Sequence, residues 1–497
     1  MNVTHLLNKN AKEIPNKPTL IFQDNPISFA ELREIVFKLA NGLDAIGIKP
    51  HDRVGIYLPN WPEYVYAYLA VFCLGATAVP LDYMLTEEEM ASCLGHCEAK
   101  AIIAKAKDIT MFKKLMQDVP MLKHVVLLDS TEKEYLDFNT VITRASADFK
   151  CRVVNEEDIA VILYTSGTTG RPKGIMLSYR HLDAPCLATD YILHYTDNDI
   201  FAAIVPFSHI AGLMYPLLSI SFGMTIVLNE RFIPLRFLQG VQQYKATLFF
   251  MVPSMYYAML HLKEFETIDL SSIRAVVVFG APSNPDLLRR FHRYCPKASF
   301  INGWGLTETC GPSVVLPLGS DRIESVGKPM PWNEIKIVDE DGKEVVMGGA
   351  GEIIFKSWTV MKGYYKDEEE TRRVIRDGWF STGDIGNIDA DGYVYIIGRK
   401  KEMIKVSGEL VYATEVETVL LNHPAVKEAA VIGAPDSLRG EVIKAVVSLK
   451  EGAKLTQEDL RYFAKDHLAH FKVPHIVAFM DTLPKNRTGK IDKTQLR

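Results

Sequence analysis

Residues 164–174 combine hydroxyl, glycine and basic side chains in a spacing that suits a polyphosphate. The stretch reads Tyr-Thr-Ser-Gly-Thr-Thr-Gly-Arg-Pro-Lys-Gly. Glycine allows backbone conformations that are closed to residues with a Cβ atom, so successive N–H groups can point into one concavity. The hydroxyls add donors, and the basic side chains add positive charge. The expected phosphate contacts are Thr165, Ser166, Gly167, Thr168, Thr169, Gly170 and Lys173.

This stretch differs from the common nucleotide-binding loop, and a Ser/Gly-rich surface turn is the plain alternative. The common loop requires G-x-x-x-x-G-K-[ST], whereas here the lysine precedes the last glycine. The apolar run at 158–164 leads directly into the stretch and is typical of a buried strand. A flexible linker has no reason to follow such a strand. The sequence therefore predicts a strand followed by a phosphate-binding loop.

Four further motifs follow in order. They are 302–308 (Asn-Gly-Trp-Gly-Leu-Thr-Glu), 381–384 (Ser-Thr-Gly-Asp), 398–408 (Gly-Arg-Lys-Lys-Glu-Met-Ile-Lys-Val-Ser-Gly) and 484–491 (Pro-Lys-Asn-Arg-Thr-Gly-Lys-Ile). Together with the loop, they resemble the signatures of the adenylate-forming superfamily. That superfamily includes acyl-CoA synthetases, the adenylation domains of peptide synthetases and firefly luciferase. The resemblance runs from about Ser28 to the C-terminus.

The resemblance implies an ATP-dependent acyl-CoA synthetase that works in two steps. A carboxylate and ATP would give acyl-AMP and pyrophosphate, and CoA would then give acyl-CoA and AMP. No protein nucleophile is needed, because the substrate carboxylate attacks the α-phosphorus. Positioning alone can supply about 7–11 kcal/mol, and preorganised cations at the phosphoryl group supply much of the rest. ATP, Mg²⁺ and CoA are therefore the expected cofactors and co-substrates.

The same resemblance implies which residues contact the nucleotide. Trp304 would lie against adenine, Thr307 would meet the α-phosphate and Glu308 would coordinate Mg²⁺. Mg²⁺ usually takes one or two carboxylates together with phosphate oxygens, so one glutamate suffices. Asp384 would accept from the ribose hydroxyls, and Arg399 would reach the ribose or a phosphate. The other expected nucleotide contacts are Gly280, Ala281, Pro282, Asn302, Gly303 and Gly305.

Two lysines near the C-terminus imply two half-reactions. By resemblance, Lys490 would bridge the carboxylate and ATP during acyl-AMP formation. Lys405 and Gly408 match residues that face the active site only in the thioester-forming conformation. Lys401 occupies the hinge position, where many family members carry aspartate. We therefore expect a lid that rotates between two positions about Lys401.

The segment 206–212 bears on the substrate. Amino-acid-activating relatives carry an aspartate in this motif, and here Ser208 stands in its place. An amino acid is therefore disfavoured, because its buried ammonium group would lack a partner. His209 and Gly212 are predicted at the acyl pocket or its gate, although His209 could equally be structural. We expect a medium- or long-chain fatty acid, and an aryl or short-chain acid stays open.

Other functions are weighed against this one. The acyl group could pass to the phosphopantetheine of a carrier protein, although the insertion that carrier-loading relatives often have near the hinge is not evident. Oxygen-using luciferase chemistry needs a specialised substrate. A catalytically silent nucleotide- or acyl-binding protein would need no adenylation lysine such as Lys490. A kinase-type phosphotransferase would release ADP rather than AMP, so the product nucleotide distinguishes it.

The composition is that of a large globular protein. At 497 residues, the chain should form two or more domains, and its net charge of −5 gives no reason to expect nucleic acid. Seven cysteines do not make a disulfide scaffold, and Cys93, His96 and Cys97 lack a second ligand pair with zinc spacing. No signal pattern opens the chain, so we expect a cytoplasmic protein.

Two uncharged stretches, 64–81 and 200–229, are long enough to cross a membrane. Internal proline and glycine residues favour buried helix, turn and strand pieces instead. We expect no transmembrane span. Peripheral membrane contact and a homodimer both stay open.

The elements that must position these residues alternate between helix and strand. A capping box at Ser28–Glu31 predicts a helix start, and apolar runs such as 225–228 predict strands. This alternation predicts a layered α/β fold. We expect residues 1–400 to form sheets flanked by helices plus a small β-barrel-like part, and residues 401–497 to form a mobile α+β lid. Acidic residues 368–370 are predicted to be a solvated helix start without function.

Overall fold

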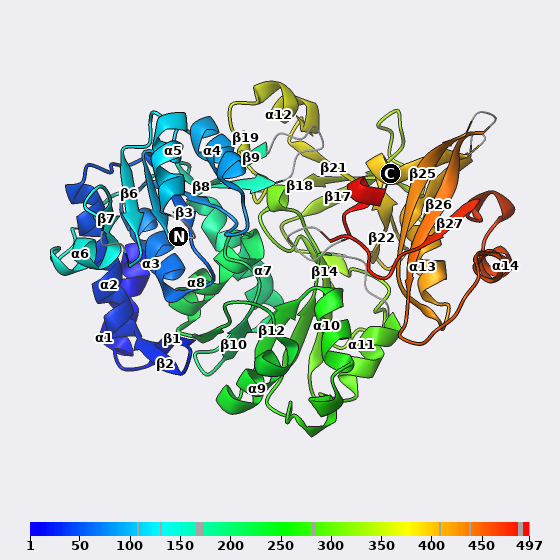
Figure 1. Ribbon diagram of the computed structural model, residues 1–497, viewed down its shortest axis with the longest axis horizontal. Coiled ribbons are helices and arrows are strands. Elements are labelled where there is room, and N and C mark those ends of the chain that lie inside the picture. Colours follow the sequence, from blue (N-terminus) through cyan, green and yellow to red (C-terminus); the bar gives the residue numbers. More distant parts are fainter. Residues whose placement is uncertain are drawn as a thin grey trace.

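The computed structural model describes the chain except residues 107–108, 130–131, 151, 166–172, 281–284, 407–408, 437–438, 486–490 and 497, and the side chains of 285–287. Within the described part, the strands form four sheets (Figure 1). Two large sheets and a small one belong to the first 400 residues, and the fourth sheet follows them. The predicted α/β class is confirmed.

The nine-stranded sheet has the order β16-β15-β14-β13-β12-β10-β11-β1-β2. Its strands are β1 (Pro18–Phe22), β2 (Asn25–Ser28), β10 (Ile200–Ala203), β11 (Thr225–Leu228), β12 (Leu248–Met251), β13 (Ala275–Val278), β14 (Ser299–Trp304), β15 (Val314–Val315) and β16 (Lys328–Pro329). The strands from β1 through β11, β10, β12 and β13 to β14 run parallel. Every residue of β11 is buried, which explains why three of its four residues are apolar.

The eight-stranded sheet has the order β19-β9-β8-β4-β3-β5-β6-β7. Its strands are β3 (Arg53–Tyr57), β4 (Thr77–Pro80), β5 (Ala101–Ala104), β6 (His124–Leu127), β7 (Leu136–Asp137), β8 (Ile159–Thr165), β9 (Lys173–Ser178) and β19 (Gly363–Tyr364). The strand predicted at 158–164 is therefore confirmed as β8. It pairs antiparallel with β9, and Thr165 lies opposite Lys173. The two strands thus bring both ends of the predicted phosphate loop together.

Helices flank these sheets (Figure 1). They are α1 (Val3–Glu13), α2 (Phe29–Ala45), α3 (Pro62–Cys73), α4 (Glu87–His96), α5 (Thr110–Asp118), α6 (Phe138–Thr143), α7 (Ala184–Leu193), α8 (Ile210–Phe222), α9 (Pro234–Tyr244), α10 (Pro253–Leu260), α11 (Pro285–His292), α12 (Glu368–Val374), α13 (Ala413–Leu421) and α14 (Gln457–His467). The capping box predicted at Ser28 and Glu31 is present at the start of α2. Short 3₁₀ helices occur at Arg180–Asp183, Lys263–Thr267, Thr307–Thr309, Lys400–Glu402, His470–Lys472 and Lys493–Leu496.

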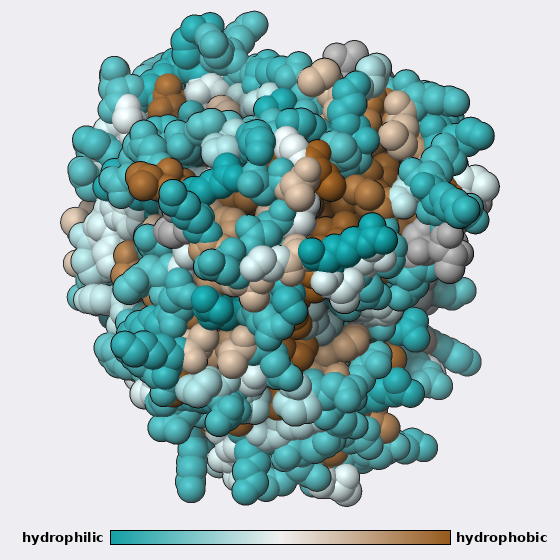
Figure 2. Space-filling view, turned by 90° about the vertical axis from the view of Figure 1, so that its left-hand side faces the viewer, coloured by the Kyte–Doolittle hydropathy of each residue, from teal (hydrophilic) through white to brown (hydrophobic). Residues whose placement is uncertain are grey.

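The two uncharged stretches form buried parts of this core. The first contains α3 and β4, and the second contains β10, α8 and β11. Among the described residues, no helix has the length and apolar character needed to cross a membrane. The visible face in Figure 2 is mainly hydrophilic, with apolar side chains in scattered small patches.

A small antiparallel sheet precedes the hinge. It contains β17 (Glu334–Val338), β18 (Gly351–Lys356), β20 (Ile375–Arg376), β21 (Trp379–Ile388) and β22 (Val394–Arg399). The turn at 389–392 joins β21 to β22, and Gly392 has a φ of 81° there. Only glycine adopts such a conformation readily, which is why this turn could be predicted.

The fourth sheet has a hydrophobic core of its own. It consists of β23 (Met403–Val406), β24 (Glu409–Tyr412), β25 (Val426–Asp436), β26 (Gly440–Leu449) and β27 (Ile476–Phe479). Its buried side chains pack with those of α13 and α14, as Val416 and Leu460 do. The boundary that we propose at residues 400 and 401 falls in the 3₁₀ helix between β22 and β23.

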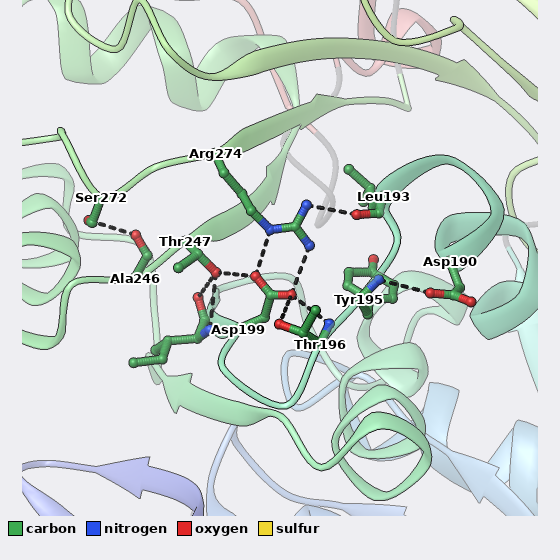
Figure 3. A network of polar contacts seen from close by, with 10 residues as sticks. Asp190, Leu193, Tyr195, Thr196, Asp199, Ala246, Thr247, Ser272 and Arg274 are labelled. Atoms are coloured by element: carbon green, nitrogen blue, oxygen red, sulfur yellow. Dashed lines mark hydrogen bonds and ion pairs between the residues drawn. The ribbon is translucent and has the colours of Figure 1, made fainter.

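An ion pair with a buried carboxylate joins the amino ends of three central strands (Figure 3). Asp199 directly precedes β10, and Arg274 directly precedes β13. Arg274 donates from Nε to Oδ1 at 2.6 Å and from Nη2 to Oδ2 at 2.8 Å. Thr247, which directly precedes β12, donates to Oδ1 at 2.8 Å, and the Thr196 amide donates to Oδ2 at 2.9 Å. This network lies at the opposite end of the sheet from the cavity described next.

Candidate active site

The carboxyl ends of strands from both large sheets meet at one cavity of about 900 Å³. Lining residues follow β10, β12 and β13, as Val205, Val252 and Phe279 do. From the other sheet, Leu58 follows β3 and Asp82 follows β4. Open α/β sheets bind ligands outside the carboxyl ends of their strands. The cavity is therefore where the fold itself places a site.

One wall of the cavity is formed by the predicted adenine-binding segments. Five of the residues that are predicted to contact the nucleotide line the cavity here: Gly280, Gly303, Trp304, Gly305 and Thr307. A methyl group on Gly305 would lie 2.0 Å from the carbonyl oxygen of Gly311, so only glycine fits there. Asn302 does not line the cavity. Its buried amide donates to the carbonyl of Ser325 at 3.0 Å and fixes the motif from behind.

Trp304, Asp384 and Arg399 form one connected group. The indole N–H of Trp304 donates to Oδ2 of Asp384 at 2.8 Å, and Nε of Arg399 lies 2.5 Å from Oδ1. Asp384 and Arg399 are cross-strand neighbours on β21 and β22. Asp384 is buried, and Trp304 is 9% exposed. The structure thus brings together three residues from separate motifs, and their nucleotide roles stay predictions.

Glu308 is held by a side chain that the sequence did not reveal. The hydroxyl of Tyr364 donates to Oε1 of Glu308 at 3.1 Å. The amide of Met361 donates to the Glu308 carbonyl at 2.8 Å. Burial, followed by the charge of Glu308, raises the pKa of Tyr364, so this hydroxyl stays protonated and can donate. One oxygen of Glu308 is therefore fixed by Tyr364.

Lys173 is paired with an acidic residue of α12. Its ammonium lies 2.5 Å from Oε1 of Glu370 and 4.9 Å from the centre of the Tyr364 ring. Glu370 also binds Arg373. The hydrogen bond from Arg373, with a further one from Lys173, outweighs burial and lowers the pKa of Glu370 to about 2.

The acidic run at 368–370 was correctly placed at a helix start. The prediction that it is solvated is wrong for Glu370, whose side chain is only 16% exposed. The reason is that α12 packs beside β19, which itself pairs with β9 next to Lys173. Such a contact between distant segments leaves no periodic signal in the sequence.

Several predicted residues lie outside the described part of the chain. They are Ser166, Gly167, Thr168, Thr169, Gly170, Ala281, Pro282, Gly408 and Lys490. Their predicted roles stay predictions. Described residues border all four segments concerned, at Thr165 and Lys173, at Gly280, at Val406 and Glu409, and at Lys485 and Ile491.

The lid contributes one lysine to the cavity. Lys485 lines it and also forms an ion pair with Glu428 at 2.7 Å. Lys401 and Lys405 are exposed and do not line the cavity. Lys493, on the other side of residues 486–490, binds Glu402 at 2.5 Å. The structure therefore turns the segment that precedes Lys490, rather than the one that contains Lys405, toward the cavity.

The deeper wall of the cavity is apolar. It includes Ile192, Leu193, Ile204, Ile210, Ala211, Met214, Phe250, Met255, Ala258 and Ile301. His209 lines the cavity and forms the N-cap of α8. Gly212 is not among the lining residues, and a methyl group there would lie 2.0 Å from the carbonyl oxygen of Pro206, so close packing also requires glycine at this position. The acyl-pocket or gate role of both residues stays a prediction.

Known proteins resemble this chain along almost its whole length. Residues 7–365 match the family model for AMP-binding enzymes, and residues 415–490 match that for the AMP-binding enzyme C-terminal domain. A feruloyl-CoA synthase of Amycolatopsis sp is 34% identical, with 98% of this chain and 97% of that protein covered. A long-chain-fatty-acid–CoA ligase of Bacillus subtilis is also 34% identical, with 99% and 93% covered.

Solved structures agree with these relatives. The anthranilate CoA ligase AuaEII in complex with anthranoyl-AMP superposes with a TM-score of 0.93 at 29% identity, covering 100% of this chain and 96% of that one. ATP-bound MatB from Rhodopseudomonas palustris gives 0.92 at 30% identity, covering 100% and 98%. The chain therefore belongs to the AMP-binding enzymes of the adenylate-forming superfamily, and it is an AMP-forming acid–CoA ligase.

Proposed function

We propose that this enzyme joins an apolar monocarboxylate, first of all a medium- or long-chain fatty acid, to CoA through an acyl-AMP intermediate. The observation that carries this proposal is the set of apolar side chains that line the cavity together with Trp304 and Gly303. Ligand pockets of this kind recognise the bulk of a ligand by burial of apolar surface and orient it with a few polar groups. Four charged residues also line the cavity, Asp82, Glu230, Arg231 and Lys485, and these are the groups that a second carboxylate or an ammonium group would have to meet.

An aryl carboxylic acid is the second candidate. The feruloyl-CoA synthase relative is as similar to this chain as the fatty-acid ligase relative is. The cavity wall also contains aromatic side chains, Phe250 and Phe279, that could pack against a ring.

Mg²⁺ bound with ATP fits the residues around Glu308. Oε1 of Glu308 accepts the hydrogen bond from Tyr364, so the other carboxylate oxygen would be the one that coordinates a metal ion. No group of three or more His, Cys, Asp and Glu side chains gathers as a metal site in the described ranges, and Cys93, His96 and Cys97 do not form one. A protein cage is not required, because Mg²⁺ usually keeps waters and substrate phosphate oxygens as ligands. When bound, the ion would offset phosphate charge.

The chain's own residues would then act by position and charge. Lys173 would meet phosphate oxygens beside the loop, and Thr307 would donate its hydroxyl to the α-phosphate. We propose that the lid position described above serves acyl-AMP formation, because Lys485 and not Lys405 reaches the cavity. Thiol attack would require the lid to turn about Lys401 and bring Lys405 in.

Two variants test this division of labour. Lys490→Ala should abolish acyl-AMP formation, measured as ATP–pyrophosphate exchange, and should leave thioester formation from supplied acyl-AMP. Lys405→Ala should do the reverse. Equal loss of both steps in both variants would contradict the two-position lid.

The substrate is tested by incubating the enzyme with ATP, Mg²⁺, CoA and a ladder of fatty, aryl and amino acids, with products identified by mass spectrometry. We expect AMP and one class of apolar acyl-CoA. Acyl-AMP without thioester would point to a carrier protein as acceptor. ADP, or turnover of amino acids, would contradict the proposal.

A further inference from the structure

Tyr364 lies between the two residues that handle charge at the proposed ATP site. Its hydroxyl donates to Glu308 at 3.1 Å, and its ring face lies 4.9 Å from the ammonium of Lys173. Glu308 and Lys173 come from different parts of the chain, the 3₁₀ helix Thr307–Thr309 and the start of β9. Tyr364 is thus one side chain in contact with both.

The backbone of Tyr364 is fixed from two sides. It belongs to β19, where it lies opposite Ile175 of β9, and its amide donates to the hydroxyl of Thr371 at 2.9 Å. The neighbouring Tyr365 amide donates to Gly174, next to Lys173, at 2.7 Å. The ring is only 6% exposed, so it has little freedom to rotate away. A rigid donor of this kind can set the direction of a carboxylate.

We propose that Tyr364 is a positioning residue for the metal-bound nucleotide, in that its hydroxyl fixes Glu308 as a one-oxygen ligand while its ring holds Lys173 nearby. This inference rests on the proposed function, because it assumes that Glu308 meets Mg²⁺. Residues that orient a metal ligand through a hydrogen bond commonly change metal affinity or activity by about 10–100-fold when they are removed.

The experiment tests the role of the Tyr364 hydroxyl separately from that of its ring. Tyr364→Phe removes the donor to Glu308 and keeps the ring face against Lys173. Tyr365→Phe is the matched control, because that neighbouring hydroxyl makes no contact with Glu308, while its ring packs edge-on against His96 at 5.6 Å. Binding of Mn²⁺ is measured by the loss of its free electron-paramagnetic-resonance signal in the presence of α,β-methylene-ATP, which cannot transfer its adenylyl group to a carboxylate. The same analogue is titrated without metal.

Tyr364→Phe should weaken Mn²⁺ binding in the ternary complex by about 10-fold or more. Binding of the analogue without metal should stay within about twofold of the wild type, as judged against the Tyr365→Phe control. In a Glu308→Gln background, Tyr364→Phe should add no further loss, since the residue acts through Glu308. Circular dichroism and the melting temperature verify that each variant is folded.

Two outcomes would overturn the inference. The first is unchanged Mn²⁺ binding in a folded Tyr364→Phe variant, and the second is an equal loss with and without metal. If Tyr364→Phe does not fold, Glu308→Asp is the second variant, because its shorter side chain draws the carboxylate away from the Tyr364 hydroxyl. Loss of Mn²⁺ binding in Glu308→Asp as in Glu308→Gln would support an oriented carboxylate, and wild-type binding in Glu308→Asp would contradict it. If the wild type binds Mn²⁺ no better with the analogue than without it, the proposed function itself fails.

Discussion

Replacing Asp199 with asparagine should destabilise the part of the chain before residue 400 by about 3 kcal/mol. Removing one partner of a buried ion pair commonly costs about 3–5 kcal/mol, because a charge is left uncompensated. Here the lower figure applies. The Arg274 side chain is 36% exposed and keeps a second acceptor, the Leu193 carbonyl at 2.7 Å, so it can be partly rehydrated.

Replacing Arg274 should lower the free energy of unfolding by more than replacing Asp199 does. In Arg274→Met, the carboxylate of Asp199 stays in a position where it is only 3% exposed and loses both guanidinium donors. An exposed pair gives the matched control, Glu157→Gln. Glu157 pairs with Lys362 at 2.7 Å, and both side chains are more than 40% exposed. Such an exposed pair contributes little to stability.

The assay is urea unfolding followed by tryptophan fluorescence. All five tryptophans lie before residue 400, so the signal follows the N-terminal part and not the lid. The midpoint should fall most for Arg274→Met, less for Asp199→Asn and least for Glu157→Gln. If the three midpoints coincide, the network at the amino ends of β10, β12 and β13 does not stabilise the fold in the way argued.

Three further predictions concern single features. Gly212→Ala should lower the free energy of unfolding by about 1–3 kcal/mol or more, since the added methyl meets the Pro206 carbonyl at 2.0 Å. The same change should also alter the KM for the acid by shifting the cavity wall. Trp304→Phe keeps a flat ring but removes a donor to buried Asp384, and should lower the urea midpoint by the equivalent of about 1.5–3 kcal/mol. Glu370 has a lowered pKa, about 2 in place of 4.5. The stability that its ion pairs give to the folded state is therefore fully present above pH 4.5 and is lost as the pH falls toward 2. Acid unfolding should therefore change in Glu370→Gln and not in Glu369→Gln.

Elements with local causes were predictable from the sequence. The run 225–228 is β11 with those bounds, because β-branched and apolar residues fill a fully buried parallel strand and the hydroxyl of Thr225 donates to the Pro18 carbonyl. The capping box at Ser28 and the turn at 389–392 depend on neighbouring side chains and on glycine, and both were found. The strand predicted to lead into the phosphate loop is β8, whose apolar residues gave the signal, whereas its pairing with β9 was not predicted.

Contacts between distant segments were not predictable. Glu370 and Lys173 are 197 residues apart, and Tyr364 and Glu308 are 56 apart. The strand that brings them together, β19, is two residues long and has no periodicity of its own. The acidic run therefore had the appearance of an ordinary exposed helix start. Only the pairing of β19 with β9 brings α12, and with it Glu370, next to Lys173.

The group formed by Trp304, Asp384 and Arg399 links the cavity wall to the hinge. Arg399 is the last residue of β22, and the 3₁₀ helix Lys400–Glu402 follows it at once. The proposed rotation of the lid about Lys401 would move the backbone next to the Arg399–Asp384 ion pair, and Asp384 in turn accepts from the indole N–H of Trp304. Since Asp384 is buried, pulling Arg399 away would break a close charge contact of that carboxylate, which is costly in a buried place. We therefore expect a rotation of this kind to begin after Arg399, which is where Lys401 lies.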